Sequence, residues 1–170
     1  MKNALVICTL LCAAVLFLAA CHKEKELVRL NVRLTDNPAN FQQVNVDIRQ
    51  LRAKMAGDSS QWLILSTNAG VYNLLDFQNG IDTLLATGTL PGDRLMELRF
   101  ILGDNNSVVA DGVQFPLDAP SAQDSGLKIK VDQDLNLDVN TLTVDFDAQE
   151  SILQTGAGGY KLKPVIRVKS

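Results

Sequence analysis

The chain has 170 residues, of which 16 are basic and 19 acidic, and its net charge is −3. This mildly acidic balance argues against a nucleic-acid-binding protein, because such proteins present a basic surface to the phosphate backbone. The length is sufficient for one domain with a sizeable hydrophobic core after a short leader is removed.

Residues 1–20 have the composition of a secretory signal peptide. A short start with Lys2 precedes an uncharged apolar stretch at 4–20. This stretch is shorter than the roughly 20 residues of a membrane-spanning helix, but it suits the apolar region of a signal peptide. We therefore expect residues 1–20 to be removed, which leaves 15 basic and 19 acidic residues and a net charge of −4.

The motif Leu18-Ala19-Ala20-Cys21 at the end of this stretch resembles the bacterial lipobox. Small residues before the cut fit a narrow protease pocket, and the cysteine thiol is the nucleophile that takes the diacylglycerol. Processing would leave Cys21 as a triacylated N-terminus, whose palmitate-like chains bury methylenes at roughly 0.8 kcal/mol each. The alternative is an ordinary secretory cleavage next to a chance cysteine. The other two cysteines lie in the leader, so the mature chain has no partner for an intrachain disulfide.

Residues 21–26 form a charged segment without apolar periodicity. It is either a solvated tether or, in a sharper reading, an export signal, since it resembles the lysine-plus-acidic signal of surface lipoproteins of the Bacteroidetes. Lys25 interrupts the acidic residues and departs from that pattern. We expect a lipid-anchored protein of the cell envelope, on the outer rather than the inner membrane. Exposure on the surface or on the periplasmic side stays open.

From residue 27 onward the dominant apolar period is two, which is typical of half-buried strands. The segments with this alternation are 28–34, 96–102, 127–131 and 142–146. In the segment 44–55 the apolar set changes phase after Ile48. Because a slip of one residue turns every side chain to the other face, the change predicts a β-bulge near Arg49-Gln50.

The remaining segments are shorter and are separated by turn residues. Asp111-Gly112 predicts a two-residue hairpin, and short strands are expected at 62–66 and 71–74. One or two helical turns are expected within 76–87. A final strand at 160–168 contains Pro164, which favours an edge position or a bulge. Together these patterns predict an all-β, two-sheet antiparallel β-sandwich over residues 27–170.

Five segments resemble, in order, the hallmark segments of the family called domain of unknown function 4382. They are VRLTDNPANFQQVNVDI, YNLLDFQNG, LPGDRLMELRFILGDNNSVV, PSAQDSGLKI and VDFDAQESILQTGAGGYKLKPVIRV. The resemblance runs from about residue 27 to 168. It implies a bacterial or archaeal lipoprotein or secreted protein with an immunoglobulin-like or prealbumin-like sandwich. It implies no activity and no catalytic residues.

The inventory of reactive side chains argues against an enzyme. The only histidine is His22, and the only mature cysteine is Cys21, both in the tether. No Ser-His or Cys-His pair can therefore form on the domain, and the ligands for a zinc site are absent from it. We expect no catalytic activity and no cofactor.

Carboxylates are the remaining candidates for chemistry. A strand-like alternation would place five oxygen-bearing side chains on one face, as a row that could hold Ca²⁺. These residues are Asp132, Asp134, Asn136, Asp138 and Asn140. The row begins like a calcium-binding loop, but Leu137 and Thr143 stand where that motif needs Gly and Glu. The alternative is a solvated acidic face.

Three further groups are candidates for a site. Asp104 lies with Asn105, Asn106 and Asp111 in a loop that could bind a metal or ligand, although such residues also cap turns. Asp145 and Asp147 share one strand face, as an acid-base pair or as part of a charged surface. Four aromatic residues near strand ends could line a sugar-binding rim or could pack in the core, namely Phe41, Trp62, Tyr72 and Tyr160.

These observations favour a lipid-anchored, non-catalytic envelope protein that serves as a binding or adhesion module for an unknown ligand. A glycan or another envelope protein is the expected partner, and the membrane is reached through the lipid on Cys21. Two alternatives stay open: a structural accessory that docks on another envelope protein, and a carboxylate-based hydrolase.

Overall fold

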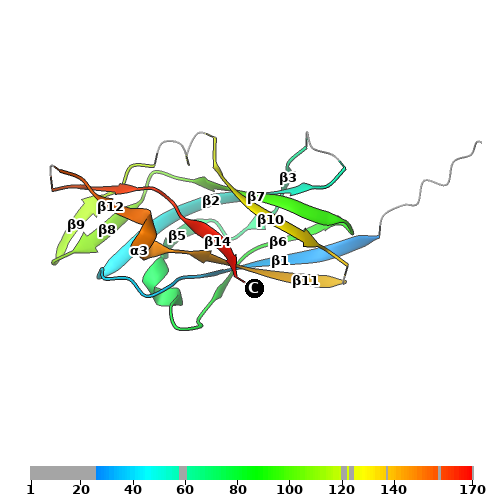
Figure 1. Cartoon of the computed structure of the whole chain (residues 1–170), viewed down its shortest axis with the longest axis horizontal. Helices are drawn as coiled ribbons and strands as arrows, with labels where there is room; N and C mark the ends of the chain where they lie inside the picture. The colour runs from blue at the N-terminus through cyan, green and yellow to red at the C-terminus, as the bar shows by residue number, and fades with distance from the viewer. Residues whose placement is uncertain are drawn as a thin grey trace, which may run out of the picture.

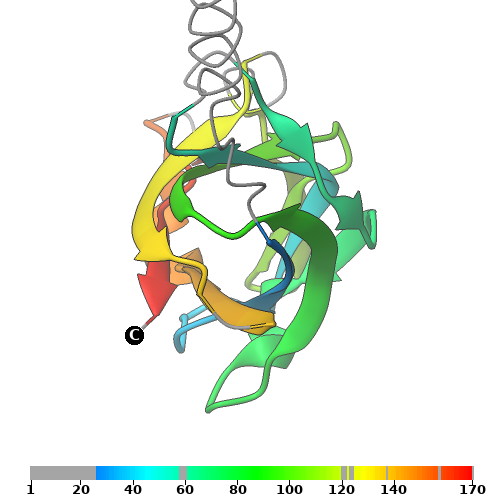
Figure 2. The same cartoon turned by 90° about the vertical axis from the view of Figure 1, so that its right-hand side faces the viewer.

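The computed structural model of this chain describes residues 26–57, 61–119, 122, 125–136, 138–156 and 158–169. Two facing sheets enclose one hydrophobic core (Figure 1). Figure 2, which looks along the strands, shows β10, β7 and β2 on one side of the core and β11, β1 and β6 on the other. The predicted all-β sandwich is therefore confirmed.

The five-stranded sheet has the order β14-β11-β1-β6-β4. Its strands are β1 (Leu27–Thr35), β4 (Ser66–Thr67), β6 (Thr83–Pro91), β11 (Val139–Phe146) and β14 (Ile166–Lys169). β1 pairs antiparallel with β6 and parallel with β11, where Arg29 lies opposite Val139. This parallel pair departs from the purely antiparallel arrangement that was expected. It places the first strand in the middle of the sheet.

The seven-stranded sheet contains β10 (Leu127–Asp134), β7 (Arg94–Leu102), β2 (Gln43–Met55), β8 (Ser107–Ala110) and β9 (Val113–Pro116) in that order. β3 (Leu63–Ile64) and β5 (Gly70–Asn73) also pair with β2. The register of β2 against β7 shifts between Ile48 and Gln50, so the predicted bulge is confirmed. The Asp111-Gly112 hairpin is also confirmed, because both residues have the positive φ that such a turn requires.

The segment 63–67 crosses from one sheet to the other. β3 pairs with β2, and β4 pairs with β6 in the opposite sheet. Leu65 lies between the two short strands and is buried. Its Cδ2 approaches to 2.5 Å from the point where a Cβ on Gly88 would lie, so the absence of a side chain at Gly88 lets Leu65 enter the core.

The expectation of one or two helical turns within 76–87 is wrong. The structure has a 3₁₀ turn, η1 (Leu74–Phe77), followed by strand β6. Ile81, Leu84 and Leu85 have helical spacing, but the pairing of β6 with β1 decides the conformation. The single final strand expected at 160–168 is wrong: Pro164 lies in a break between β13 (Tyr160–Leu162) and the edge strand β14, and the two strands belong to different sheets. A proline cannot donate a ladder hydrogen bond, which fits the break at this position.

β13 pairs with β12 (Ile152–Gln154) in a small two-stranded sheet that follows the single-turn helix α3 (Ala148–Ser151). The core is aliphatic, with Phe100 and Phe146 as the largest fully buried side chains. Every described strand and all of the described core lie after residue 26, so a chain that starts at residue 21 contains the complete sandwich. In the described part of the chain, no helix is both long and apolar enough to cross a membrane.

Candidate functional site

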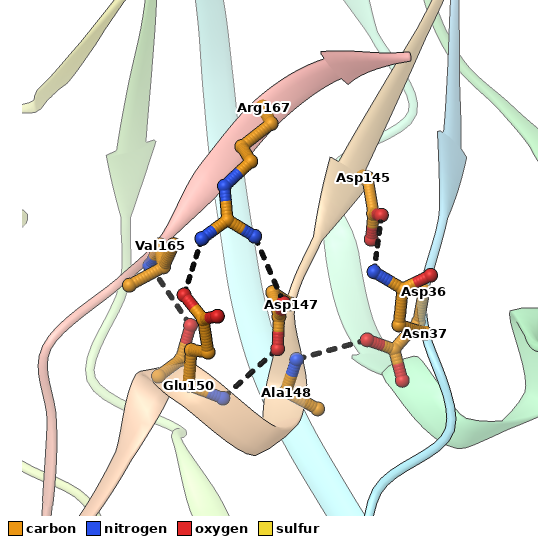
Figure 3. Close-up of polar contacts among 9 residues, drawn as sticks. Asp36, Asn37, Asp145, Asp147, Ala148, Glu150, Val165 and Arg167 are labelled. Carbon is orange, nitrogen blue, oxygen red and sulfur yellow. Dashed lines mark hydrogen bonds and ion pairs between the residues drawn. The ribbon is translucent and has the colours of Figure 1, made fainter.

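Three buried carboxylates gather where β1 and β11 end (Figure 3). Asp145 and Asp147 are 7% and 6% exposed, and Asp36 is 2% exposed. The expectation that Asp145 and Asp147 form an exposed charged surface is therefore wrong. The loop after β1, helix α3 and strand β14 cover this end of the sheet, and all three supply its partners.

Asp147 is the N-cap of α3. Its Oδ1 accepts a hydrogen bond of 2.9 Å from the backbone N–H of Glu150, which satisfies a free donor of the first helical turn. Its Oδ2 accepts from Arg167 at 3.0 Å, and the same guanidinium binds Glu150. Asp147 therefore joins α3 to β14. The spacing of Asp147 and Glu150 is that of a capping box, a sequence signal that would have indicated this turn.

Asp36 connects the loop after β1 to the same helix. Its Oδ1 accepts from the backbone N–H of Ala148 at 2.9 Å, and its Oδ2 accepts from Gln78 Nε2 at 3.2 Å. Burial raises the pKa of Asp36 to about 6, although these hydrogen bonds oppose the shift and the charge of Asp145 adds to it. The group is thus close to its titration midpoint in mildly acidic solution.

Asp145 accepts a hydrogen bond of 2.6 Å from Asn37 Nδ2, while its Oδ1 is buried and has no hydrogen-bond partner. Burial raises its pKa, and repulsion by Asp147 adds to the rise. Lys169, Asn37 and Arg167 act in the opposite direction. Because Asp36 and Asp147 both accept from backbone N–H groups, this cluster has the chemistry of a structural network rather than of a catalytic pair.

The predicted row of oxygen ligands from Asp132 to Asn140 does not form on one strand face. Asp132 has φ of +59° at a register shift in β10, and the strand ends at Asp134. Both carboxylates bind Arg94, with Nε 2.6 Å from Asp132 and Nη1 3.2 Å from Asp134. Arg94 lowers the pKa of Asp132 through its hydrogen bond and its charge. The guanidinium of Arg94 is therefore already bound to both carboxylates.

The other two metal candidates lie elsewhere. Asp138 and Asp104 are exposed and belong to separate loops. Among the described residues no group of three or more His, Cys, Asp or Glu side chains could hold a metal ion. Asn136 and Asn140 therefore join no cluster of described acidic ligands.

The asparagines next to Asp104 have a structural role. Asn106 Oδ1 accepts from the backbone N–H of Asp47 at 2.9 Å, and Asn105 Nδ2 donates to Asp47 Oδ2 at 3.2 Å. Arg49 also binds that oxygen, at 2.7 Å. The loop thus closes over the fully buried Asp47 and caps it, as turn-forming residues do.

A shallow groove of about 600 Å³ lies on the outer face of the five-stranded sheet. We call it the β1–β6 groove. It is lined by Arg29, Asn31, Ile64, Ser66, Leu84, Thr87, Gly88 and Thr89. The outward-facing side chains of β1 alternate with buried ones, so Arg29 and Asn31 stand opposite Thr89 and Thr87 of β6. The short strand β4 adds Ser66 opposite Thr87.

The chemistry of the β1–β6 groove is polar and uncharged except for one guanidinium. Three hydroxyls and one carboxamide can each donate and accept hydrogen bonds, and none of the lining residues is acidic. Arg29 is exposed, and its side chain makes no ion pair with a described residue. Ile64 and Leu84 add two apolar surfaces to the lining. This combination suits a ligand with many hydroxyl groups and small C–H faces.

The aromatic residues considered as a rim divide between the core and the surface. Tyr160 packs against Phe115 and Phe41 with ring centroids 5.0 and 6.3 Å apart, and Tyr72 packs against Phe77 at 6.1 Å. Phe41 and Tyr160 also line a hollow of about 280 Å³. Trp62 lies apart from these residues, beside Arg99. Cys21 and His22 lie outside the described residues, as does the expected leader 1–20.

The fold defines a β-sandwich protein, and in its described part the carboxylates Asp36 and Asp147 hold backbone N–H groups of α3. The family model "Domain of unknown function (DUF4382)" matches residues 28–164, and the chain belongs to this family. No curated protein and no solved structure matches the chain. The resemblance that its sequence segments showed is therefore confirmed at the level of the family.

Proposed function

We propose that this protein is a lipid-anchored, non-catalytic protein of the cell envelope that binds a hydroxyl-rich ligand, a glycan, in the β1–β6 groove. The observation that carries the proposal is the groove itself, in which Asn31, Ser66, Thr87 and Thr89 present polar groups beside Arg29. Sugar hydroxyls pair with such side chains, and the C–H faces of sugar rings pack on apolar ones such as Ile64.

The lipid anchor is supported by the pattern Leu18-Ala19-Ala20-Cys21 after an apolar leader. The non-catalytic role is supported by the buried carboxylates, since Asp36 and Asp147 hold backbone N–H groups of α3. The chain enters the sandwich through β1, which also forms one wall of the β1–β6 groove. A tether at this point would hold the groove close to the membrane that carries it, which we take to be the outer membrane.

Binding is tested by a glycan array followed by calorimetry on the best ligand. Thr87→Val removes one hydroxyl from the β1–β6 groove and should weaken binding up to about tenfold, the value of one hydrogen bond. Thr141→Val is the matched control, because Thr141 lies on the other side of Asn31 on the same sheet face but outside the groove. Equal affinities of the two variants would refute the assignment of the ligand to the groove.

The anchor is tested separately, by metabolic labelling of cells with a fatty acid. The wild-type protein should be labelled and the Cys21→Ala variant should not. Labelling of both to the same extent would contradict lipidation at Cys21. Protease treatment of intact cells then distinguishes the two sides of the outer membrane, since only a surface-exposed protein is degraded.

A further inference from the structure

Basic side chains cross the outer face of the seven-stranded sheet in two adjacent rows. In the first row Arg52 of β2, Arg99 of β7 and Lys128 of β10 lie directly opposite one another. The second row consists of Lys54, Glu97 and Lys130. The residues between the rows, Ala53, Leu98 and Ile129, are buried, so both rows point outward. We call the five cations of the two rows the basic face.

Neighbouring carboxylates compensate the basic face only in part, because Glu97 lies between Lys54 and Lys130 and the charge of Lys130 also acts on Asp132. Like charges directly opposite each other in a sheet are unfavourable, and the first row places three cations side by side. The second row contains one acidic residue, Glu97, which lies 3.8 Å from Lys54. Within the described residues the other four cations make no ion pair. The arrangement lowers stability locally, as expected of a surface that meets an anionic partner.

Trp62 lies against this surface. Its ring centroid is 4.1 Å from Arg99 Cζ and 5.7 Å from Lys54 Nζ, which is the geometry of a cation–π contact. Arg99 Nε is buried and has no hydrogen-bond partner. Arg52 pairs with Ile64 of β3, which is 65% exposed and lies at the edge between the basic face and the β1–β6 groove. Tryptophan and exposed aliphatic groups next to lysine and arginine are the composition of a membrane-interface surface.

The basic face also lies near the point where the chain enters the sandwich, which is where a membrane anchor would hold it. The backbone carbonyl of Glu26 accepts from Gly92 N–H at 2.6 Å, so the chain enters the sandwich next to the turn that precedes β7. Glu97 lies five residues beyond Gly92, at most about 17 Å along the strand. Figure 2 views the molecule from the end at which β1 begins. The five residue-to-residue steps from Cys21 to Glu26 span at most about 18 Å, so a membrane to which Cys21 is attached is within reach.

We propose that the basic face docks on a membrane surface rich in anionic, phosphate-bearing lipid headgroups, with Trp62 at the headgroup level. In a chain with a net charge of −3, five cations and one carboxylate on a single sheet face make a strongly asymmetric charge distribution. Such a distribution orients the molecule at an anionic surface. The contact is additional to the acyl anchor and does not depend on it, because its residues belong to the folded sandwich.

The test uses residues 21–170 with Cys21→Ser, which contain the complete sandwich and carry no acyl group. Trp62 is the only tryptophan of the chain, so its emission reports contact at the basic face. Vesicles of phosphatidylglycerol and phosphatidylcholine should change the emission, and vesicles of phosphatidylcholine alone should not. The response should decrease with added salt, because the attraction is electrostatic.

Lys128→Gln combined with Lys130→Gln should weaken binding to the anionic vesicles about 30-fold, since each lysine near such a surface contributes about a factor of five. Lys161→Gln combined with Lys163→Gln is the matched control and should leave binding within twofold of wild type. Both pairs are exposed lysines two residues apart, and Lys161 and Lys163 belong to β13 and the break after it.

Three outcomes would overturn the proposal. The first is equal vesicle binding by both double variants. The second is the same emission change with inorganic phosphate at matched phosphate concentration, which would indicate a discrete phosphate site instead of a surface. The third is tighter binding to a soluble uronate polymer than to the vesicles at matched charge, which would assign the basic face to a glycan. The protein tested lacks Cys21, so the vesicle experiments test the basic face independently of whether Cys21 is lipidated in cells.

Discussion

Asp36 should make the protein more stable in mildly acidic solution than at neutral pH. Its carboxyl is 2% exposed and its pKa is raised to about 6, whereas an aspartate in an unfolded chain has a pKa of about 3.9. A folded-state pKa above the unfolded one means that the native state binds more protons between these two values. The stabilising contribution is therefore complete below about pH 4 and is lost as the pH rises through 6.

The magnitude follows from the two pKa values. At 1.36 kcal/mol per unit, a shift of about two units corresponds to about 3 kcal/mol, of which about 2.5 kcal/mol is lost between pH 4 and pH 7. Asp36→Asn removes this titration. The amide oxygen can still accept from Ala148 N–H, and rotation of the Gln78 amide restores the second hydrogen bond.

The assay is urea denaturation of wild type and Asp36→Asn at pH 4, 5, 6 and 7. The wild-type free energy of unfolding minus that of the variant should decrease by about 2.5 kcal/mol over this range, and the subtraction removes groups that titrate equally in both proteins. Asp132→Asn is the control, because Arg94 lowers the pKa of that exposed carboxyl and its titration therefore falls below pH 4, so its difference should stay nearly constant from pH 4 to pH 7. A difference for Asp36 that is flat or that rises with pH would refute the reasoning.

Three further substitutions test the packing. Phe100→Ala removes a fully buried ring and should lower the free energy of unfolding by about 3–5 kcal/mol in urea denaturation, and a loss under 1 kcal/mol would contradict the core assignment. Gly103→Ala would place a Cβ in steric conflict with the buried carboxylate of Asp47 and should cost about 1–3 kcal/mol, whereas the Cβ of Gly70→Ala would meet nothing within 4 Å. Similar thermal midpoints for the two variants would speak against this close approach. Asp147→Ala should be about 1 kcal/mol less stable than Asp147→Asn, because asparagine also caps α3, and equal stabilities would exclude the N-cap role.

The strands were predictable wherever one face of the chain is buried and the other is solvated. Alternation located β1 and β11, and its change of phase located the bulge after Ile48. These features are local, because the period of side chains along a strand is two and the bulge shifts it by one. The hairpin at Asp111-Gly112 was predictable for a similar reason, since its backbone favours those residue types.

The carboxylate cluster was not predictable from alternation. A pattern of period two assigns Asp145 to the solvated face, opposite Val144 and Phe146. Asp145 is bound by Asn37, which is more than a hundred positions away in the sequence. No local sequence pattern indicates that such a distant segment will bury the carboxylate. The predicted row of oxygen ligands failed for a related reason. Alternation assumes a continuous strand, and the chain leaves the ladder after Asp134, where the buried Leu135 donates its N–H to Asp93 O.

The central position of β1 has a mechanical consequence. A pull on the residues that precede Glu26 is applied to a strand held along its length by β6 on one side and β11 on the other. The force runs along the strand, so the hydrogen bonds of both ladders resist it together instead of opening one after another. An edge strand pulled away from its sheet would lose its bonds in sequence. The sandwich is thus built to carry load at the point where an envelope anchor would apply it.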